Sequence, residues 1–340
     1  MKLNILLAGA GFMGRRHLHS LLNHPDIEKV YVTDSFPAVF DIVRNEFTAD
    51  ELSRITFLNE GLQADIKGKT DAALISTSAQ NRGLLIQEVI DLGIKNILVE
   101  KPVEQSYKKV LQVVEVAKKN DAKVFVNFTR RAYAAYLELF RFISSTDQFK
   151  GKMEFIISGG ALGIGCNGSH LIDLCLWLSG AENFEILGAG INDTLVTSGR
   201  GKNYADFGGW IDVKLLDKNN AECGNICARL SSESTAPHGI TILGTHARID
   251  LDEIHKQYTF TLRKPDSQLP LHRYASDYNQ PETVNYNLEN WDIAVNEWVK
   301  SIRGQQKILL PFLADSLLVH RLVFDWLNYS KEFKDEFPIT

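Results

Sequence analysis

The sequence predicts an α/β protein, with a doubly wound parallel sheet followed by an α+β part that holds a largely antiparallel sheet. Up to about residue 126, short apolar runs alternate with segments of helical length, which is the pattern of βαβ units. After about residue 150, strand-like runs follow one another with loops between them, which favours antiparallel pairing. At 340 residues the chain is long enough for two domains.

Each expected strand is an apolar or β-branched run that is too short for a helix and is bounded by polar or glycine-containing turns. In the first part the strands cover 3–8, 30–33, 55–58, 71–77, 96–99 and 123–127, and the helices cover 15–22, 37–47, 82–92 and 106–120. In the second part the strands cover 153–157, 184–191, 210–216, 222–230, 239–243, 248–251 and 258–262, with one helix over 169–178. A long surface loop over 267–289 and two amphipathic helices, 291–302 and 314–329, complete the chain.

A glycine-rich turn, Gly9-Ala10-Gly11-Phe12-Met13-Gly14, lies between the first strand and the first helix and matches G-x-G-x-x-G. The second strand ends in Asp34, 20 positions after Gly14. The glycines permit a tight turn, close approach of a pyrophosphate and close helix–strand packing, and the helix N-terminus offers N–H groups to phosphates. A carboxylate at Asp34 would bind ribose hydroxyls and repel a 2′-phosphate. The sequence therefore predicts a Rossmann domain over 1–124 that binds NAD, with NADP disfavoured.

Composition and charge narrow the classes of partner. The formal net charge of -5 includes no basic block, which argues against nucleic acid as a partner. The four cysteines form no C-x-x-C pair, and no metal site is expected. The first strand begins almost at Met1 and no apolar run is long enough to cross a bilayer, so we expect no signal peptide, no membrane contact and a cytoplasmic location.

Two further segments carry groups suited to acid–base chemistry. Lys101, within Glu100-Lys101-Pro102, lies at the carboxyl end of a predicted parallel strand, where α/β sheets bind ligands. His170 and Asp173 lie one turn apart in the helix that begins near residue 169, for which Ser169 is the expected N-cap. Each segment also has a structural interpretation, a solvated lysine at a strand end and a packed histidine near a helix start.

Taken together, these features resemble the glucose–fructose oxidoreductase / inositol dehydrogenase / MocA family over nearly the whole chain. The similar segments are 9–17 (GAGFMGRRH), 71–81, Glu100-Lys101-Pro102, Asn127 with Arg131, 168–173 (GSHLID) and 244–251. The resemblance implies an open-faced second sheet in a substrate-binding and oligomerisation domain over 125–340, and a homodimer or homotetramer formed through that sheet. It also implies reversible hydride transfer at a secondary hydroxyl of a sugar, polyol or sugar nucleotide.

The resemblance assigns roles to individual residues. It implies that Lys101 and His170 carry the acid–base role, with Asp173 beside them, and that they meet next to the nicotinamide. The implied cofactor contacts are Gly9, Ala10, Gly11, Phe12, Met13, Gly14, Asp34, Ser76, Thr77, Ser78, Asn81, Glu100 and Lys101. The implied substrate contacts are Asn127, Arg131, Asn167 and His170. His17, His19 and His24 are interpreted as helix-surface or packing residues.

The chain departs from the family pattern at two places. Cys166 stands four residues before His170, where the family often has Asp, and Ser78 and Arg82 stand where the family usually has Pro and His. The first departure leaves open an alternative function, a non-catalytic NAD-dependent sensor or regulator of the same architecture. Retention of Lys101 and His170 favours an enzyme.

Overall fold

The computed structural model describes residues 2–58, 62, 66–160, 162–197, 203–264, 267, 277–287 and 292–340. The chain forms two compact units. Unit 1 comprises Met1–Ala132, Glu289–His320 and Asp335–Thr340, and unit 2 comprises Tyr133–Leu288 and Arg321–Lys334. The predicted domain limits, 1–124 and 125–340, stay a prediction.

Unit 1 contains a parallel six-stranded sheet in the order β3-β2-β1-β4-β5-β6. Its strands are β1 Leu3–Ala8, β2 Ile27–Thr33, β3 Ile55–Leu58, β4 Ala72–Ile75, β5 Asn96–Val99 and β6 Lys123–Val126. Its helices are α1 Phe12–Asn23, α2 Val39–Glu46, α3 Ala49–Ser53, α4 Arg82–Asp91, α5 Tyr107–Lys119, the 3-10 helix η2 Thr129–Ala132 and α8 Asp292–Ile302. The strand order reverses between β1 and β4, which makes the carboxyl ends of these strands the expected ligand site.

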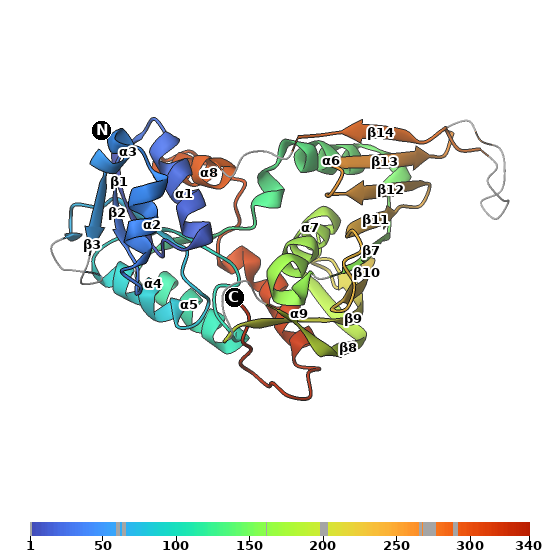
Figure 1. Cartoon of the computed structure of the whole chain (residues 1–340). Helices are drawn as coiled ribbons and strands as arrows, with labels where there is room; N and C mark the ends of the chain where they lie inside the picture. The colour runs from blue at the N-terminus through green and yellow to red at the C-terminus, as the bar shows by residue number, and fades with distance from the viewer. Residues whose placement is uncertain are drawn as a thin grey trace. The chain divides into compact units, whose positions relative to one another are not determined.

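Helices cover both faces of the unit 1 sheet, with α1, α2 and α8 on one face and α4 and α5 on the other (Figure 1). The strands are buried on both faces and read as continuous apolar runs for that reason. Helix α8 packs against α1 and buries Trp298 completely in the same core. Thus a segment far along the chain completes the first unit.

Unit 2 contains an eight-stranded sheet in the order β14-β13-β12-β11-β7-β10-β9-β8, in which only the β7–β10 pair is parallel among the described strands. The strands are β7 Met153–Gly160, β8 Asn183–Thr197, β9 Ala205–Leu216, β10 Glu222–Ser231, β11 Gly239–Leu243, β12 Ala247–Asp252, β13 Gln257–Leu262 and β14 Glu282–Asn285. The helices are α6 Ala134–Ser145, the 3-10 helix η3 Asp147–Phe149, the π-helical turn η4 Gly163–Gly168 and α7 Ser169–Ser179. The 3-10 helix η5 Ala314–Ser316 lies in unit 1, and α9 Leu317–Leu327 begins in unit 1 and ends in unit 2. The predicted fold class is therefore confirmed.

Helices α6 and α7 lie on the same side of the unit 2 sheet (Figure 1). Burial alternates along β9: Ile211 and Val213 are buried, whereas Trp210 between Gly209 and Ile211 is 41 % exposed. This alternation is typical of an antiparallel sheet with one covered and one uncovered face.

One sequence expectation needs correction, one helix was missed, and one expected helix start lies outside the described residues. Within the loop expected over 267–289, the structure describes residues 267 and 277–287, and these include β14, which pairs with β13. Helix α6 was not predicted, and Trp291, the expected start of the helix 291–302, lies outside the described residues. Among the helices that the structure describes, none is long and apolar enough to cross a membrane.

Candidate functional site

The glycine turn after β1 is fixed by lack of space around two of its members. Gly9 has a φ of 91°, and a Cβ there would lie 2.7 Å from the Ser76 carbonyl carbon and the Thr77 nitrogen. A Cβ on Gly14 would lie 1.9 Å from the Gly9 oxygen. At Gly11, by contrast, nothing lies within 4 Å of the Cβ position. The turn is therefore packed where it meets the sheet and open where a pyrophosphate would approach, so these residues fit a dinucleotide.

Asp34 lies at the carboxyl end of β2 and is bonded to the glycine turn. Its Oδ2 accepts a hydrogen bond from the Ala10 N–H at 2.7 Å, and its Oδ1 accepts one from the Phe36 N–H at 2.9 Å. Ala10 is fully buried, so this bond holds the half-buried carboxylate at the mouth of the turn. Phe12 and Met13 continue from the turn as the first residues of α1, and no acidic side chain lies in that first turn. The predicted ribose and phosphate contacts therefore adjoin one another.

The other predicted cofactor residues follow β4. Ser76 is buried, Thr77 and Ser78 are half-buried, and the Thr77 hydroxyl donates to the Ser78 carbonyl at 3.2 Å. Asn81 is exposed, has a φ of 58° and precedes α4 without a side-chain cap. Because Gly9 packs on Ser76 and Thr77, this loop and the glycine turn lie against each other.

Glu100 lies in a buried polar cluster at the end of β5. Its Oε1 lies 2.7 Å from His17 Nε2 and accepts a hydrogen bond from Asn127 Nδ2 at 2.6 Å. Lys101 follows, is 7 % exposed and joins Pro102 through a cis peptide bond. The Glu100 carboxylate is thus occupied by protein partners, and its predicted cofactor contact, like the substrate contact of Asn127, stays a prediction.

The Glu100 carboxyl is ionised over most of the pH range. Burial alone would raise its pKa, but the hydrogen bond and charge interaction with His17, the charge of Lys101 and the Asn127 hydrogen bond together lower the pKa to about 2, from 4.5. A carboxylate with a depressed pKa stabilises the fold at pH values above its unfolded pKa and loses that contribution as the pH falls through the folded pKa.

We expect this carboxylate to make the protein sensitive to acid. Its contribution to the free energy of unfolding is about 3 kcal/mol at neutral pH, of which about 2 kcal/mol is lost by pH 3. In Glu100→Gln this pH-dependent part should be missing, so the decline in stability from pH 6 to pH 3 should be shallower. Urea unfolding at several pH values measures it, with the exposed Glu88→Gln on α4 as the control. Parallel declines in wild type and Glu100→Gln would contradict the assignment.

Arg82, the first residue of α4, joins the loops that follow β4 and β5. Its side chain is fully buried, and its guanidinium donates to the Glu100 carbonyl at 2.6 Å and also to the carbonyls of Pro102 and Thr77. One side chain therefore fixes the backbone on both sides of Lys101 and holds it to the loop that packs on Gly9. From the sequence, Arg82 was noted as a departure from the family pattern, but its hydrogen bonds to the three carbonyls were not predicted.

His17 is a packing residue, with a buried polar partner that the sequence did not indicate. Interpreted from the sequence as a helix-surface or packing residue, it is buried and bonded to Glu100. The signal that could have found it is its place in the segment 9–17, which resembles the family opening. One face of α1 carries Gly14 and His17 toward the sheet, so both positions serve the same strand ends.

In unit 2, His170 lies in the first turn of α7, where it is half-buried, and Asp173 is fully buried one turn later. The predicted N-cap, Ser169, is wrong. Gly168 holds the cap position, and the Ser169 hydroxyl instead donates back to the Cys166 carbonyl at 2.7 Å. The reason is that η4 already runs into α7 with helical backbone, so residue 169 lies inside the helical path.

Asp206 on β9 holds the η4 turn and was also missed. Its Oδ1 accepts the Gly165 N–H at 2.9 Å and its Oδ2 accepts the Cys166 N–H at 2.6 Å. Gly163 has a φ of 59°, and a Cβ there would lie 2.3 Å from Asp206 Oδ2. The turn that presents Cys166 and the exposed Asn167 is therefore shaped around a buried carboxylate.

The predicted residues are thus grouped within each unit. Asn127 follows β6 beside Glu100, and Arg131 lies half-buried in η2, both in unit 1 with Lys101. Asn167, His170 and Asp173 belong to unit 2. The expected meeting of Lys101 with His170 stays a prediction, because the two residues belong to different units.

Comparisons with known proteins find a family match for part of the first unit. Residues 3–128 match the family model described as "Oxidoreductase family, NAD-binding Rossmann fold" (GFO_IDH_MocA). The inositol 2-dehydrogenase of Rhizobium meliloti (strain 1021) is 30% identical over 125 residues, which are 37% of this chain and 36% of that protein. The match thus spans about a third of that relative's length.

Solved structures share the fold of the whole chain. The UDP-N-acetylglucosamine 3-dehydrogenase GnnA from Acidithiobacillus ferrooxidans has a TM-score of 0.69 at 15% identity and covers 96% of each chain. An oxidoreductase from Agrobacterium radiobacter, in complex with NAD+, L-tartaric acid and magnesium, has a TM-score of 0.70 at 15% identity, over 98% of this chain and 97% of that one. These likenesses show the two-part fold. The family match confirms the predicted resemblance and the NAD-binding fold for residues 3–128.

Proposed function

We propose that this chain, whose residues 3–128 match the model of the oxidoreductase family with an NAD-binding Rossmann fold, is an NAD-dependent dehydrogenase that acts on CH–OH groups. One observation carries the proposal: an arginine-clamped loop holds the buried Lys101 at the carboxyl edge of the sheet that also carries the glycine turn. The turn packs on Thr77, Arg82 bonds Thr77 to Glu100, and Lys101 comes next. A solvated lysine at a strand end would need no such support.

In the proposed mechanism the chain's own residues handle the proton. NAD, when bound, supplies the hydride acceptor. Lys101 and His170 act as the acid–base residues that take the proton from a secondary hydroxyl and return it in the reverse direction. Glu100 keeps a negative charge next to Lys101, and Arg82 fixes the peptide groups on both sides of it. Asp173, buried one turn from His170, orients the imidazole.

The proposed substrate is a sugar, a polyol or a sugar nucleotide. The relatives named above include an inositol dehydrogenase and a UDP-N-acetylglucosamine dehydrogenase, which supports this class. Asn127, Arg131 and Asn167 are the proposed substrate contacts besides His170. The first two lie in unit 1 near the end of β6, and Asn167 is exposed on the turn before α7.

The test is NADH formation by the purified protein across a panel of polyols, free sugars and sugar nucleotides, with Lys101→Ala as the blank. Turnover of at least one substrate class that disappears in Lys101→Ala is the expected result. NAD binding without turnover of any member would instead favour the non-catalytic sensor. That alternative draws on Cys166, which stands four residues before His170 where the family often has Asp.

We expect Asp34 to set the cofactor preference. In Asp34→Ser, the Ala10 N–H loses its carboxylate partner and the ribose hydroxyls lose a charged acceptor, so NAD binding should weaken about tenfold while NADP binding improves. Fluorescence titration with both dinucleotides measures the change. If wild type binds NADP more tightly than NAD, this interpretation of Asp34 is wrong.

We also propose that the uncovered face of the unit 2 sheet joins copies of the chain into a homodimer or homotetramer. Trp210 is 41 % exposed there, and Arg229, opposite it on β10, forms an ion pair with Asp212 on β9. Tryptophan is enriched at protein interfaces, and a two-fold interface places the same face of both copies against each other. Light scattering of wild type and Trp210→Glu tests it.

The cytoplasmic location stays a prediction.

A further inference from the structure

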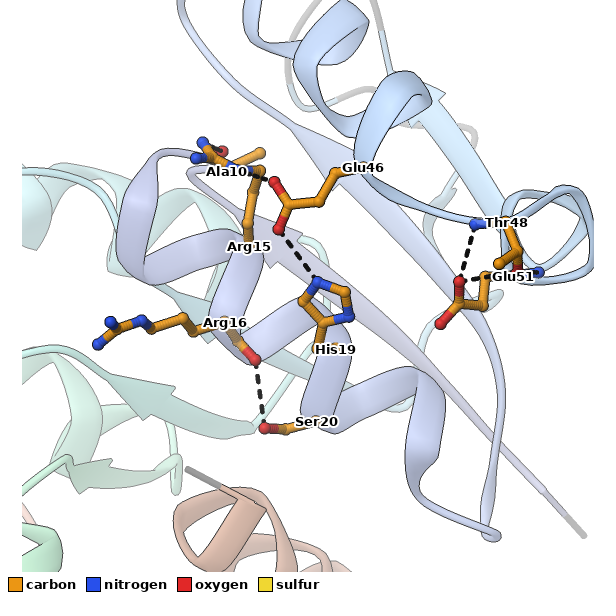
Figure 2. A network of polar contacts seen from close by, with 8 residues as sticks. All are labelled: Ala10, Arg15, Arg16, His19, Ser20, Glu46, Thr48 and Glu51. Atoms are coloured by element: carbon orange, nitrogen blue, oxygen red, sulfur yellow. Dashed lines mark hydrogen bonds and ion pairs between the residues drawn. The ribbon is translucent and has the colours of Figure 1, made fainter. Parts of the chain in front are cut away.

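The glycine turn has a charged neighbour that the proposed function does not use. Arg15, in the first turns of α1, donates from Nε to Glu46 Oε2 at 2.6 Å, and its Nη1 lies 3.4 Å from the Ala10 carbonyl oxygen. Glu46 is the last residue of α2. Its second oxygen, Oε1, lies 3.0 Å from His19 Nε2. Figure 2 shows both α1 side chains pointing at this one carboxylate.

The Glu46 carboxylate is held in place from both sides. His19 stacks on Phe47 with 4.1 Å between ring centroids, which fixes the imidazole beside the end of α2. The backbone then turns into α3 through a capping box, in which Thr48 and Glu51 bond each other's backbone N–H groups (Figure 2). The Glu46 carboxylate therefore has a partner at each oxygen, Arg15 at Oε2 and the stacked His19 at Oε1.

Ala10 connects this ion pair to Asp34, whose carboxylate is predicted to bind the ribose hydroxyls. Ala10 gives its N–H to Asp34 and turns its carbonyl toward Arg15, so Asp34 and Arg15 flank the same residue. A guanidinium in that position is suited to bind a 2′-phosphate with paired hydrogen bonds. Because Glu46 is bonded to its Nε, the positive charge of the guanidinium is balanced by a carboxylate. The formal charges of Asp34, Arg15 and Glu46 add up to one negative charge.

We propose that Glu46 is a second specificity-determining residue for NAD over NADP, acting by keeping Arg15 in an ion pair that a 2′-phosphate would have to break. The inference rests on the proposed dinucleotide binding. It explains why an arginine directly after G-x-G-x-x-G is compatible with a preference for NAD. Asp34 repels the phosphate, and Glu46 removes the cation that would attract it.

The test measures dissociation constants of NAD and NADP by titration, so it needs no turnover. On the Asp34→Ser background, which removes the direct repulsion, adding Glu46→Gln should tighten NADP binding about tenfold and change NAD binding less than about twofold. The gain should shrink at high salt, because it arises from charges. Adding Arg15→Gln as a third change should abolish it.

The matched control is Asp41→Asn, on the same Asp34→Ser background. Asp41 lies on α2 as well, pairs with Arg44 at 2.7 Å and gives the same change in net charge. An equal gain from Asp41→Asn, or a gain that survives Arg15→Gln, would overturn the proposal in favour of long-range charge alone. If wild type binds neither dinucleotide, the proposed function fails first, whereas NAD binding with no effect of Glu46→Gln refutes only this inference.

Discussion

Lys101→Ala is expected to lower turnover by about 10³-fold while NAD still binds. A positioned acid–base group contributes typically 10²–10⁴-fold to a rate, and loss of the amine removes that contribution from the hydride-transfer step. The glycine turn and Asp34, which make most of the predicted cofactor contacts, are bonded to each other through Ala10 and are unchanged in this variant. Dinucleotide affinity should therefore stay within about threefold of wild type.

Two variants separate chemistry from folding. Lys101→Met keeps the length of the buried side chain, so it should lose activity with less loss of stability than Lys101→Ala. Lys95→Ala alters an exposed lysine just before β5, at the amino end of the same strand, and should retain full turnover. Single-turnover kinetics with NAD and the best substrate of the panel measure the rate. Unchanged turnover in Lys101→Met would remove Lys101 from the mechanism.

The fold of the parallel unit was predictable because its signals are local. The strand β1, the glycine turn and Asp34 each follow from a short run of residues, and the structure has all of them where the sequence predicts. The strand β14 was missed for the opposite reason. β14 is four residues of mixed polarity whose identity as a strand depends on pairing with β13, which a local pattern does not contain.

At the candidate site, the sequence indicated which residues carry chemistry but not which residues hold them. Lys101 and His170 were recognisable from type and place in the chain. Arg82 and Asp206 were not, because their importance lies in bonds to backbone groups that are distant in sequence: Arg82 reaches carbonyls 18 and 20 positions away, and Asp206 accepts N–H groups 41 and 40 positions away. A charged residue in a sequence is usually assigned to the surface, and only the tertiary structure shows such partners.

Arg82→Met is expected to reduce both stability and turnover, and the two losses have one cause. Without the guanidinium, the buried carbonyls of Thr77, Glu100 and Pro102 lose a shared charged donor, which should lower the free energy of unfolding by about 3 kcal/mol or more. The Glu100 and Pro102 carbonyls flank Lys101, so its amine should be positioned less well, and we expect kcat of the folded fraction to fall at least tenfold. Arg82→His, which restores the residue common in the family, should recover part of the kcat.

Arg54 provides the matched control, because it clamps three backbone carbonyls in the same manner at the other end of the sheet. Its guanidinium donates to Leu22 at 2.6 Å, Ile27 at 2.7 Å and Glu28 at 3.1 Å, around the start of β2. Arg54→Met should therefore destabilise the protein but leave kcat per folded molecule unchanged. Urea unfolding and kcat, measured on both variants under conditions where each is more than nine-tenths folded, test the pair. If Arg82→Met lowers stability as Arg54→Met does and keeps full kcat, the clamp serves the fold alone and does not position Lys101.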